Sequence, residues 1–337
     1  MGRAGATKVP DFREHVLEAV LPFWERHSID RDYGGFITHL ARDGSVTDSS
    51  EKFLVMQARM IYSFAAGAEL GGPAEWLGLA DQGVAFLTRH FRDRVEDGWF
   101  WSTSRQGQQM QVAKRTYGHA FVVYALAEYS RIARSSHCLA SAAHTWSLIR
   151  AKLWDDRNDG AIEACDRGWQ PTERGHTMGT HLHLLEALMA LNAAEGKQRF
   201  REQGCAICDL IVQRMVEPKH RCALERFAPD WTPRQLEATD AVNYGHNLEA
   251  AWLLLRVYQQ EPVEAYRRVA RGFLDYVLRF GVDYAYGGVY SHGPRNDLAT
   301  VREKIWWVQC EALPAFLLGA LIFQDDRCLD AFRNVAT

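Results

Sequence analysis

The chain has 337 residues, of which 47% are hydrophobic, and a formal net charge of −3. This length allows a large core, as one big domain or two ordinary ones. The near-neutral charge and the lack of a basic block argue against nucleic-acid binding.

The termini and apolar runs argue against a membrane protein. Met1–Pro10 has no apolar signal core. The longest apolar run, Ala312–Phe323, has 12 residues, fewer than the roughly 20 needed to span a bilayer. We therefore expect a soluble, cytoplasmic protein with no membrane partner.

The seven cysteines show no disulfide framework, and their odd number suits a reducing compartment. Cys205 and Cys208 form a CxxC motif inside an apparent amphipathic helix. Redox or metal chemistry is possible there, but core packing is the favoured interpretation, because no second pair and no βαβ pattern accompany the motif.

The chain repeats a unit of outer helix, short β-turn segment and inner helix, with a period near 63 residues. The inner helices are predicted to begin near Glu51, Thr116, Thr177, Asn243 and Glu303. The hairpin-like segments before them are Tyr33–Phe36, Gly98–Trp101, Gly160–Glu163, Cys222–Glu225 and Gly287–Tyr290. The outer helices are predicted at about 10–26, 74–92, 137–153, 197–216 and 262–280.

The inner helices are apolar nearly all round, as expected of enclosed helices. Repeated helix pairs must stack or close, and enclosure favours a closed ring over an open solenoid. Six such hairpins make an (α/α)6 barrel. We count five complete units and one outer helix near Asp325–Val335, so we predict an all-α barrel whose sixth hairpin is incomplete. It forms a single domain, 1–337, with β-hairpin segments and the active pocket at one end.

The stretch Asn243–Leu255 reads as a buried helix with polar groups at its start. Asn243 can cap the helix. His246 and Glu249 share one face, which Ala250 and Leu253 turn inward. A histidine and a carboxylate on an inward face are costly unless partnered. A satisfied core histidine and a functional site both remain open at this point.

Other inner helices carry polar residues at corresponding positions, which favours a binding pocket. They are Arg59, Tyr117, one of His181 and His183, and one of Trp306 and Trp307 followed by Glu311. Each also has a structural interpretation: Arg59 could pair with a carboxylate, Tyr117 could be a core aromatic, and His176 could be a loop residue.

This set of residues suggests sugar chemistry. Indole rings stack on the C–H face of a pyranose, and Arg, Glu and His bind hydroxyls. Histidines suit proton transfer at carbon, and an inward Arg suits an enediolate oxyanion. His183, His246 and Glu249 could bind a metal in principle, but no HxxxH spacing supports this, so we expect no metal.

At these residues the sequence resembles the N-acylglucosamine 2-epimerase family, which includes cellobiose 2-epimerases and mannose isomerases. The matching stretches span nearly the whole chain: Tyr33–Phe36, Gln57–Arg59, Thr116–Phe121, Thr180–Ala187, Tyr244–Glu249 and Trp306–Ala312. The Tyr-Gly-His and Thr-His-Leu-His forms look more like cellobiose 2-epimerases than mannose isomerases.

The resemblance implies an (α/α)6 barrel and cofactor-free chemistry at C2 of an aldose. Arg59 would stabilise the enediolate oxygen, and His246 would be one of two acid/base histidines. Glu249 would hold the substrate or orient His246, and His183 would assist ring opening. The candidate substrate-binding residues are Tyr117, Trp252, Trp307, Glu311 and His176.

Two features depart from the family pattern. Gly179 stands where cellobiose-active relatives usually have Asn, which removes a substrate contact. The family's second catalytic histidine and a stacking Trp would follow Thr337, so we expect a fragment or a shortened relative. An open barrel would expose apolar helix faces.

We therefore predict a sugar 2-epimerase or aldose–ketose isomerase that acts on a mono- or disaccharide through proton abstraction at C2. The alternatives are a glycoside hydrolase that uses Glu249 and Glu311, or a catalytically inactive relative that binds sugar or protein. The sequence leaves open which sugar is used, whether epimer or ketose is released, and whether the chain is a monomer or a homodimer.

Overall fold

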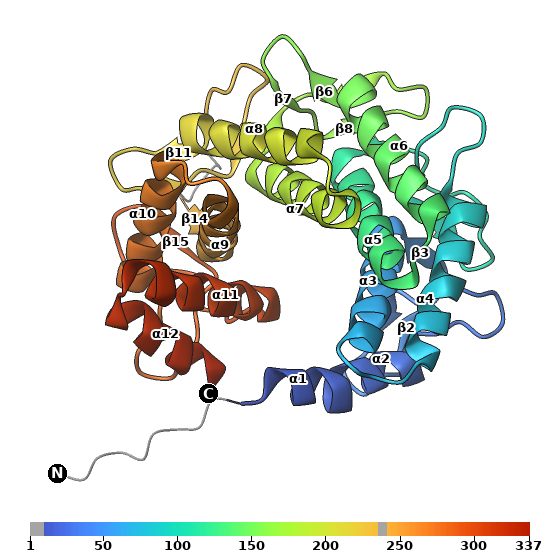
Figure 1. Cartoon of the computed structure of the whole chain (residues 1–337), viewed down its shortest axis with the longest axis horizontal. Coiled ribbons are helices and arrows are strands. Elements are labelled where there is room, and N and C mark those ends of the chain that lie inside the picture. Colours follow the sequence, from blue (N-terminus) through green and yellow to red (C-terminus); the bar gives the residue numbers. More distant parts are fainter. Residues whose placement is uncertain (1–9, 235–240) are drawn as a thin grey trace. The chain divides into compact units, whose positions relative to one another are not determined.

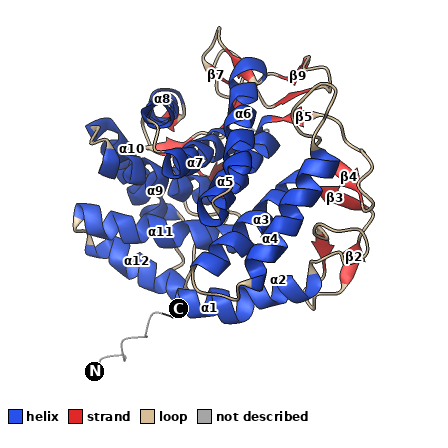
Figure 2. Cartoon of the chain, turned by 45° about the vertical axis from the view of Figure 1, so that its right-hand side comes forward, coloured by secondary structure: helices blue, strands red, loops and turns tan. Residues whose placement is uncertain are grey.

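The computed structural model describes residues 10–234 and 241–337, and helices dominate it (Figure 2). Its contacts divide the chain into two compact units. We name them the N-terminal unit, Asp11–His176 with Glu186–Gln203, and the C-terminal unit, Thr177–Leu185 with Gly204–Thr337. Each unit is described by itself.

In the N-terminal unit, each long helix packs against helices that lie close to it in the sequence. Helix α3 packs against α4 and α5, and α5 packs against α6. The helical elements are α1 (Phe12–His15), η1 (Val16–Val20), α2 (Leu21–His27), α3 (Leu54–Glu69), α4 (Glu75–Phe86), η2 (Leu87–Phe91), α5 (Thr116–Ala133) and α6 (Ser136–Lys152).

The strands of this unit are two or three residues long and antiparallel. Strand β1 pairs with β2, β3 with β4, β6 with β7, and β8 with both β5 and β9. Their bounds are β1 (His39–Leu40), β2 (Val46–Asp48), β3 (Glu51–Phe53), β4 (Ser102–Ser104), β5 (Lys114–Arg115), β6 (Trp154–Asp155), β7 (Gly160–Ala161), β8 (Ala164–Cys165) and β9 (Pro171–Glu173).

In the C-terminal unit, α9 packs against α10 and α11, and α11 packs against α12 (Figure 1). The helices are α9 (Tyr244–Gln260), α10 (Glu264–Phe280), α11 (Trp306–Phe323) and α12 (Asp326–Ala336). The strands are β11 (Val216–Glu217), β12 (Cys222–Ala223), β13 (Arg226–Phe227), β14 (Ala241–Asn243) and β15 (His292–Pro294). Three further elements include residues of both units: β10 (His176–Thr177), α7 (Met178–Glu195) and α8 (Gln198–Arg214).

The predicted repeat is confirmed element by element. The inner helices α3, α5, α7, α9 and α11 begin within three residues of the predicted starts. The first start, Glu51, lies in β3, which leads directly into α3. The predicted outer helices correspond to α1–α2, α4–η2, α6, α8 and α10, and α12 lies where the last one was expected. Whether α12 opens an incomplete sixth hairpin stays a prediction.

In four inner helices, α3, α5, α9 and α11, a polar side chain in the first turn or two holds the hairpin before the helix. The amide oxygen of Gln57 accepts from the Phe36 N–H at 2.9 Å, and His119 Nε2 accepts from the Trp99 N–H at 3.1 Å. Asn247 and Gln309 accept in the same way from the N–H groups of Ala223 and Val289. We call Gln57, His119, Asn247 and Gln309, with the repeat-equivalent His181, the anchor residues; successive ones lie 62 to 66 residues apart.

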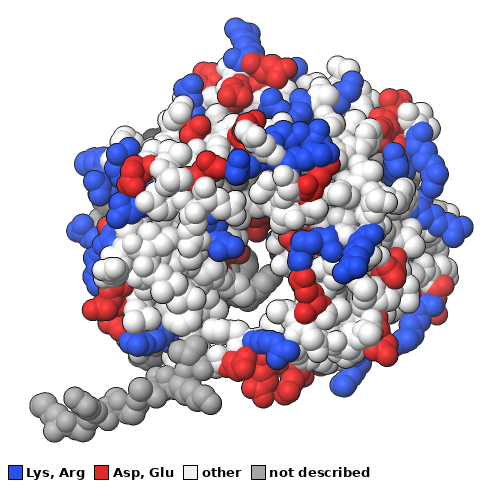
Figure 3. Space-filling model, in the orientation of Figure 1, with Lys and Arg blue, Asp and Glu red and all other residues white. Residues whose placement is uncertain are grey.

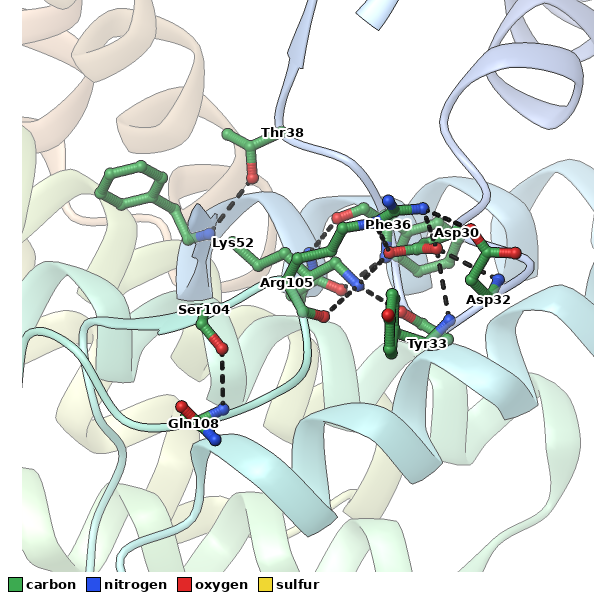
Figure 4. A network of polar contacts seen from close by, with 12 residues as sticks. Asp30, Asp32, Tyr33, Phe36, Thr38, Lys52, Ser104, Arg105 and Gln108 are labelled. Atoms are coloured by element: carbon green, nitrogen blue, oxygen red, sulfur yellow. Dashed lines mark hydrogen bonds and ion pairs between the residues drawn. The ribbon is translucent and has the colours of Figure 1, made fainter. Parts of the chain in front are cut away.

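Buried ion pairs hold the ends of these hairpins together. The Lys52 ammonium lies 2.9 Å from Asp30, which also accepts from Arg105 at 2.8 Å (Figure 4). Burial raises the pKa of Asp30, but the hydrogen bonds from Arg105 and Lys52 outweigh it and lower this pKa to about 2. The next repeat has the same pair, Lys114 with Asp93 at 2.9 Å. Separating either pair would leave a buried charge without its partner, which is costly. The pairs therefore hold the hairpin ends in one geometry.

The surface carries no single block of charge on the face shown, where acidic and basic side chains are interspersed (Figure 3). Among the described helices, α11 is long and apolar enough to cross a membrane by length and composition, and 28% of that window is buried. It is longer than the predicted apolar run because Trp306–Glu311 add to it. A core helix of a soluble protein passes the same test, so this is weak evidence, and the absence of a membrane partner stays a prediction.

Candidate active site

His246 lies in the first turn of α9, and its position is fixed at both backbone and ring. The Asn243 side chain accepts from the His246 N–H at 3.1 Å, which confirms the predicted cap. On the ring, Nδ1 lies 2.6 Å from Oε2 of Glu225. An ionised carboxylate can only accept, so Nδ1 carries the proton and Nε2 keeps its lone pair. This is the tautomer that a general base needs.

The charges around His246 favour its protonated form. Burial lowers the pKa of His246, but the charge and hydrogen bond of Glu225, with a smaller effect of Glu311, outweigh burial and raise this pKa above its usual value. A raised pKa makes the neutral ring a stronger base, which favours uptake of a proton from substrate.

The space around the His246 ring is shaped by two neighbours. The Trp307 indole lies 5.3 Å from the imidazole, between ring centroids, and is tilted by 40°. On another side, a Cβ built on Gly179 would come within 3.3 Å of Nε2. The lack of a side chain at Gly179 therefore leaves Nε2 uncovered on that side.

Glu249 and His183 form a second polar pair in the same unit. Glu249 is 3% exposed, and its Oε1 lies 3.7 Å from Nδ1 of His183. By contrast, His181 is fully buried, and its Nδ1 lies 2.8 Å from the Thr177 carbonyl oxygen. Of the two histidines on α7, His183 is thus the one that meets the predicted site residue.

The tryptophans divide in the same way. Trp306 is 70% exposed, whereas Trp307 contacts His246. The Trp252 indole donates to Oε2 of Glu311 at 2.7 Å, which links two predicted substrate-binding residues. The C-terminal unit therefore brings together six predicted site residues: His183, His246, Glu249, Trp252, Trp307 and Glu311.

Two of the three remaining candidates, Arg59 and Tyr117, lie in the N-terminal unit and share one neighbour. The Arg59 guanidinium lies 4.3 Å above the ring of Phe121, and the Tyr117 ring lies 5.0 Å from the same ring. Arg59 is exposed although the helix around it is mostly buried. Its charge is therefore accessible to a ligand.

His176 does not fit the predicted substrate-binding role. It is 1% exposed, and its Nδ1 lies 2.8 Å from the Ala161 carbonyl oxygen. A buried ring bonded to the backbone is a core histidine, whereas the structural interpretation from the sequence was a loop residue. We therefore leave His176 out of the proposed site.

Sequence reasoning missed Glu225 and His292, both in irregular or short β segments. His292 is the cross-strand partner of Asn243 in the β14–β15 ladder, so both side chains leave the ladder on the face toward the start of α9. Burial lowers the pKa of His292, with opposing influences from Glu225 and His246. Helical periodicity cannot find such residues. Their distance from the anchored hairpin positions could have: Glu225 stands two residues after Ala223, and His292 stands three residues after Val289.

Two residues of the C-terminal unit, His183 and Glu249, could be metal ligands. The expectations of no metal and no cofactor stay predictions.

The model of the N-acylglucosamine 2-epimerase family matches residues 35–337. The chain belongs to this family. The relatives that match this chain include sugar epimerases and sugar isomerases.

A cellobiose 2-epimerase from Dictyoglomus turgidum is 27% identical over 322 residues, which cover 90% of this chain and 79% of the relative. A D-mannose isomerase from Thermobifida fusca is 30% identical over 273 residues, covering 74% and 64%. The solved cellobiose 2-epimerase from Spirochaeta thermophila superposes with a TM-score of 0.87 at 28% identity, covering 96% of this chain and 82% of that one. As a member of the N-acylglucosamine 2-epimerase family, the protein is an enzyme of the isomerase class that acts on sugars.

Proposed function

We propose that the protein removes the C2 proton of an open-chain aldose through His246 and forms an enediolate. Nε2 takes the proton, and the electron pair of the C–H bond moves into the C1–C2 double bond as O1 becomes anionic. Return of a proton to C2 on the opposite face gives the epimer, and return to C1 gives the ketose. The observation that carries this proposal is the hydrogen bond between Glu225 and Nδ1 of His246, which leaves Nε2 as the basic nitrogen of a ring that lies beside Trp307.

The neighbouring residues receive roles that follow from their chemistry. The Trp307 indole offers an apolar face to the pyranose. Glu249 and Glu311 are carboxylates that can accept from sugar hydroxyls, and His183 can assist ring opening by proton transfer to the ring oxygen. From the sequence motifs, Arg59 is proposed to stabilise the enediolate oxyanion and Tyr117 to bind substrate.

Inversion at C2 needs a proton donor on each face of the enediolate, unless the sugar turns over in the site. His292 and His183 are the other histidines in the part of the C-terminal unit that carries His246. A single working base would favour the ketose, because C1 and C2 can share one face. The ratio of epimer to ketose therefore reports whether a second histidine takes part.

The substrate class follows from the relatives and remains a proposal. We propose a glucose- or mannose-configured mono- or disaccharide. Gly179 leaves extra space at Nε2, which suits a substrate that is bulky near C1 and C2. We also propose that residues 1–337 act as one (α/α)6 barrel domain with an incomplete sixth hairpin, as a soluble cytoplasmic monomer or homodimer.

The test is a product analysis of mannose, glucose, N-acetylglucosamine and cellobiose incubated with the full chain and separated by ion-exchange chromatography. The proposal expects a 2-epimer or ketose of at least one sugar, and loss of this product with His246→Asn. Monosaccharide released from cellobiose would instead support a glycoside hydrolase that uses Glu249 and Glu311. Sugar that binds but stays unchanged would support an inactive binding relative.

A further inference from the structure

Glu225 is held in place by its own backbone while its side chain reaches another helix. Its carbonyl oxygen accepts from the N–H of Met178, the first residue of α7, at 3.0 Å. Its side chain extends to His246 in the first turn of α9. Equivalent backbone bonds, from Tyr244 to Ser291 and from Leu54 to Trp101, occur in other repeats. The repeat thus fixes the backbone at the position of Glu225. A carboxylate stands at this position in the hairpin that holds Glu225 and in the preceding hairpin, where the residue is Glu163.

The carboxylate of Glu225 has an unusual environment for a structural group. Its side chain is 16% exposed, and Oε2 bonds His246. Its other oxygen, Oε1, is buried with no hydrogen-bond partner among the described residues. A buried carboxylate that is only half satisfied costs stability. Its presence is better explained by what it does to His246 than by a contribution to folding.

Three charged or titratable groups act on His246 from the surrounding elements: Glu225 from the β12–β13 segment, Glu311 from α11 and His292 from β15. Glu249, one turn further along α9, instead lies beside His183. The pKa of His246 is raised mainly by Glu225 and less by Glu311, against the effect of burial. Of these groups, Glu225 is the one whose hydrogen bond to the ring is seen, so it acts on both the charge and the tautomer of His246.

We propose that Glu225 is the positioning residue of the catalytic histidine: its hydrogen bond to the ring keeps the proton on Nδ1, so that Nε2 is the base. This inference rests on the proposed function in assigning the base, but its physical core concerns the two side chains alone. A glutamine at this position can donate as well as accept, so it would allow the wrong tautomer, with the proton on Nε2.

The experiment compares wild type with Glu225→Gln by two readouts in the full chain. Imidazole carbon–proton NMR measures the His246 pKa, with His246→Asn identifying its signal. Steady-state kinetics measures kcat against pH with the sugar found active. We expect a lower His246 pKa in Glu225→Gln, an acidic limb of the kcat profile shifted to lower pH by the same amount, and a fall in kcat of about 10²-fold.

The matched control is Glu217→Gln. Glu217 lies on the same hairpin and holds His220 through an equivalent contact, with Oε2 2.9 Å from Nδ1, but it is remote from α9 in sequence and contact. We expect no change in kcat or in the His246 pKa. Glu225→Asp serves as a second variant that keeps the charge: its His246 pKa should stay above that of Glu225→Gln even if kcat falls.

The outcomes separate the two proposals. An unchanged His246 pKa in folded Glu225→Gln overturns the positioning role. So does a kcat loss without any shift of the acidic limb and with a lowered melting temperature, which would indicate a purely structural residue. A lowered pKa in a chain that converts no sugar supports the Glu225–His246 coupling while the proposed function fails.

Discussion

Gly179 lies beside the imidazole of His246, so that even a methyl group added at this position would contact the ring. A Cβ at this position would lie 3.3 Å from Nε2, tighter than ordinary contact, so the imidazole would shift by a few tenths of an ångström. We expect Gly179→Ala to lower kcat/KM about tenfold, because small misplacements of a reacting group are costly. Steady-state kinetics checks this.

The control for Gly179→Ala is Gly78→Ala in α4, where an added Cβ meets nothing within 4 Å. Alanine there should stabilise the chain by about 0.5–1 kcal/mol through helix propensity and leave kcat/KM unchanged. Wild-type kinetics in Gly179→Ala would show that Nε2 does not face the substrate on this side.

The adjacent tryptophans Trp306 and Trp307 allow a paired test of sugar stacking. Trp307 lies against His246, whereas Trp306 is 70% exposed. We expect Trp307→Ala to raise KM about tenfold, equivalent to about 1.4 kcal/mol of lost binding. Trp306→Ala should leave KM within about twofold. Equal effects of the two substitutions on KM would contradict the assignment of Trp307 to the sugar site.

At the scale of the element, the anchor residues explain why side chains at fixed positions of the repeat share a role. Two residues after each anchor stand Arg59, Phe121, His183, Glu249 and Glu311. Because the anchor binds the hairpin backbone, the next residues of the helix have a fixed direction. Four of these five were predicted as site residues from sequence.

His119 is an anchor whose acid lability can be measured. Burial lowers its pKa to about 4. Because the pKa of His119 is lower in the folded chain than in the unfolded chain, the unfolded chain binds the proton first as the pH falls. The folded protein therefore loses stability between about pH 6.5 and pH 4. At pH 5 this costs about 2 kcal/mol.

His119→Gln should remove this cost, because Gln57 and Gln309 make the same backbone contact in other repeats. We expect the variant to match wild type within about 1 kcal/mol at pH 7 and to lose about 2 kcal/mol less on going to pH 5. Urea unfolding at both pH values measures the difference. Identical pH dependence in the two proteins would mean that His119 does not titrate on unfolding.

The sequence predicted the helices and the inward residues because both follow a period. Helix starts near Thr116 and Asn243 carry motif and capping signals, and His246 and Glu249 share a helix face. It could not choose between His181 and His183, because that choice depends on the backbone contact of His181. Glu225 was missed because its role arises from a contact 21 residues away, between a hairpin and a helix. His176 was included among the candidates because the sequence does not show that this β10 residue is buried with its ring against the Ala161 carbonyl oxygen.

At the scale of the whole molecule, the proposed single domain predicts cooperative unfolding. If residues 1–337 form one domain, scanning calorimetry should give one transition whose calorimetric and van't Hoff enthalpies agree. A substrate sugar should raise its midpoint, because a ligand that binds only the native state stabilises it. Two separate transitions, of which the sugar shifts one, would instead assign the two compact units to two domains.

The central claim is that the protein moves the C2 proton of a sugar with His246. The direct measurement is proton NMR of the active sugar in D₂O, with wild type and with His246→Asn. We expect loss of the C2 proton signal in step with product formation, and at least about 10²-fold slower loss in the variant. Product that keeps the original hydrogen, as in a direct hydride shift, or exchange that continues at the wild-type rate in His246→Asn, would contradict it.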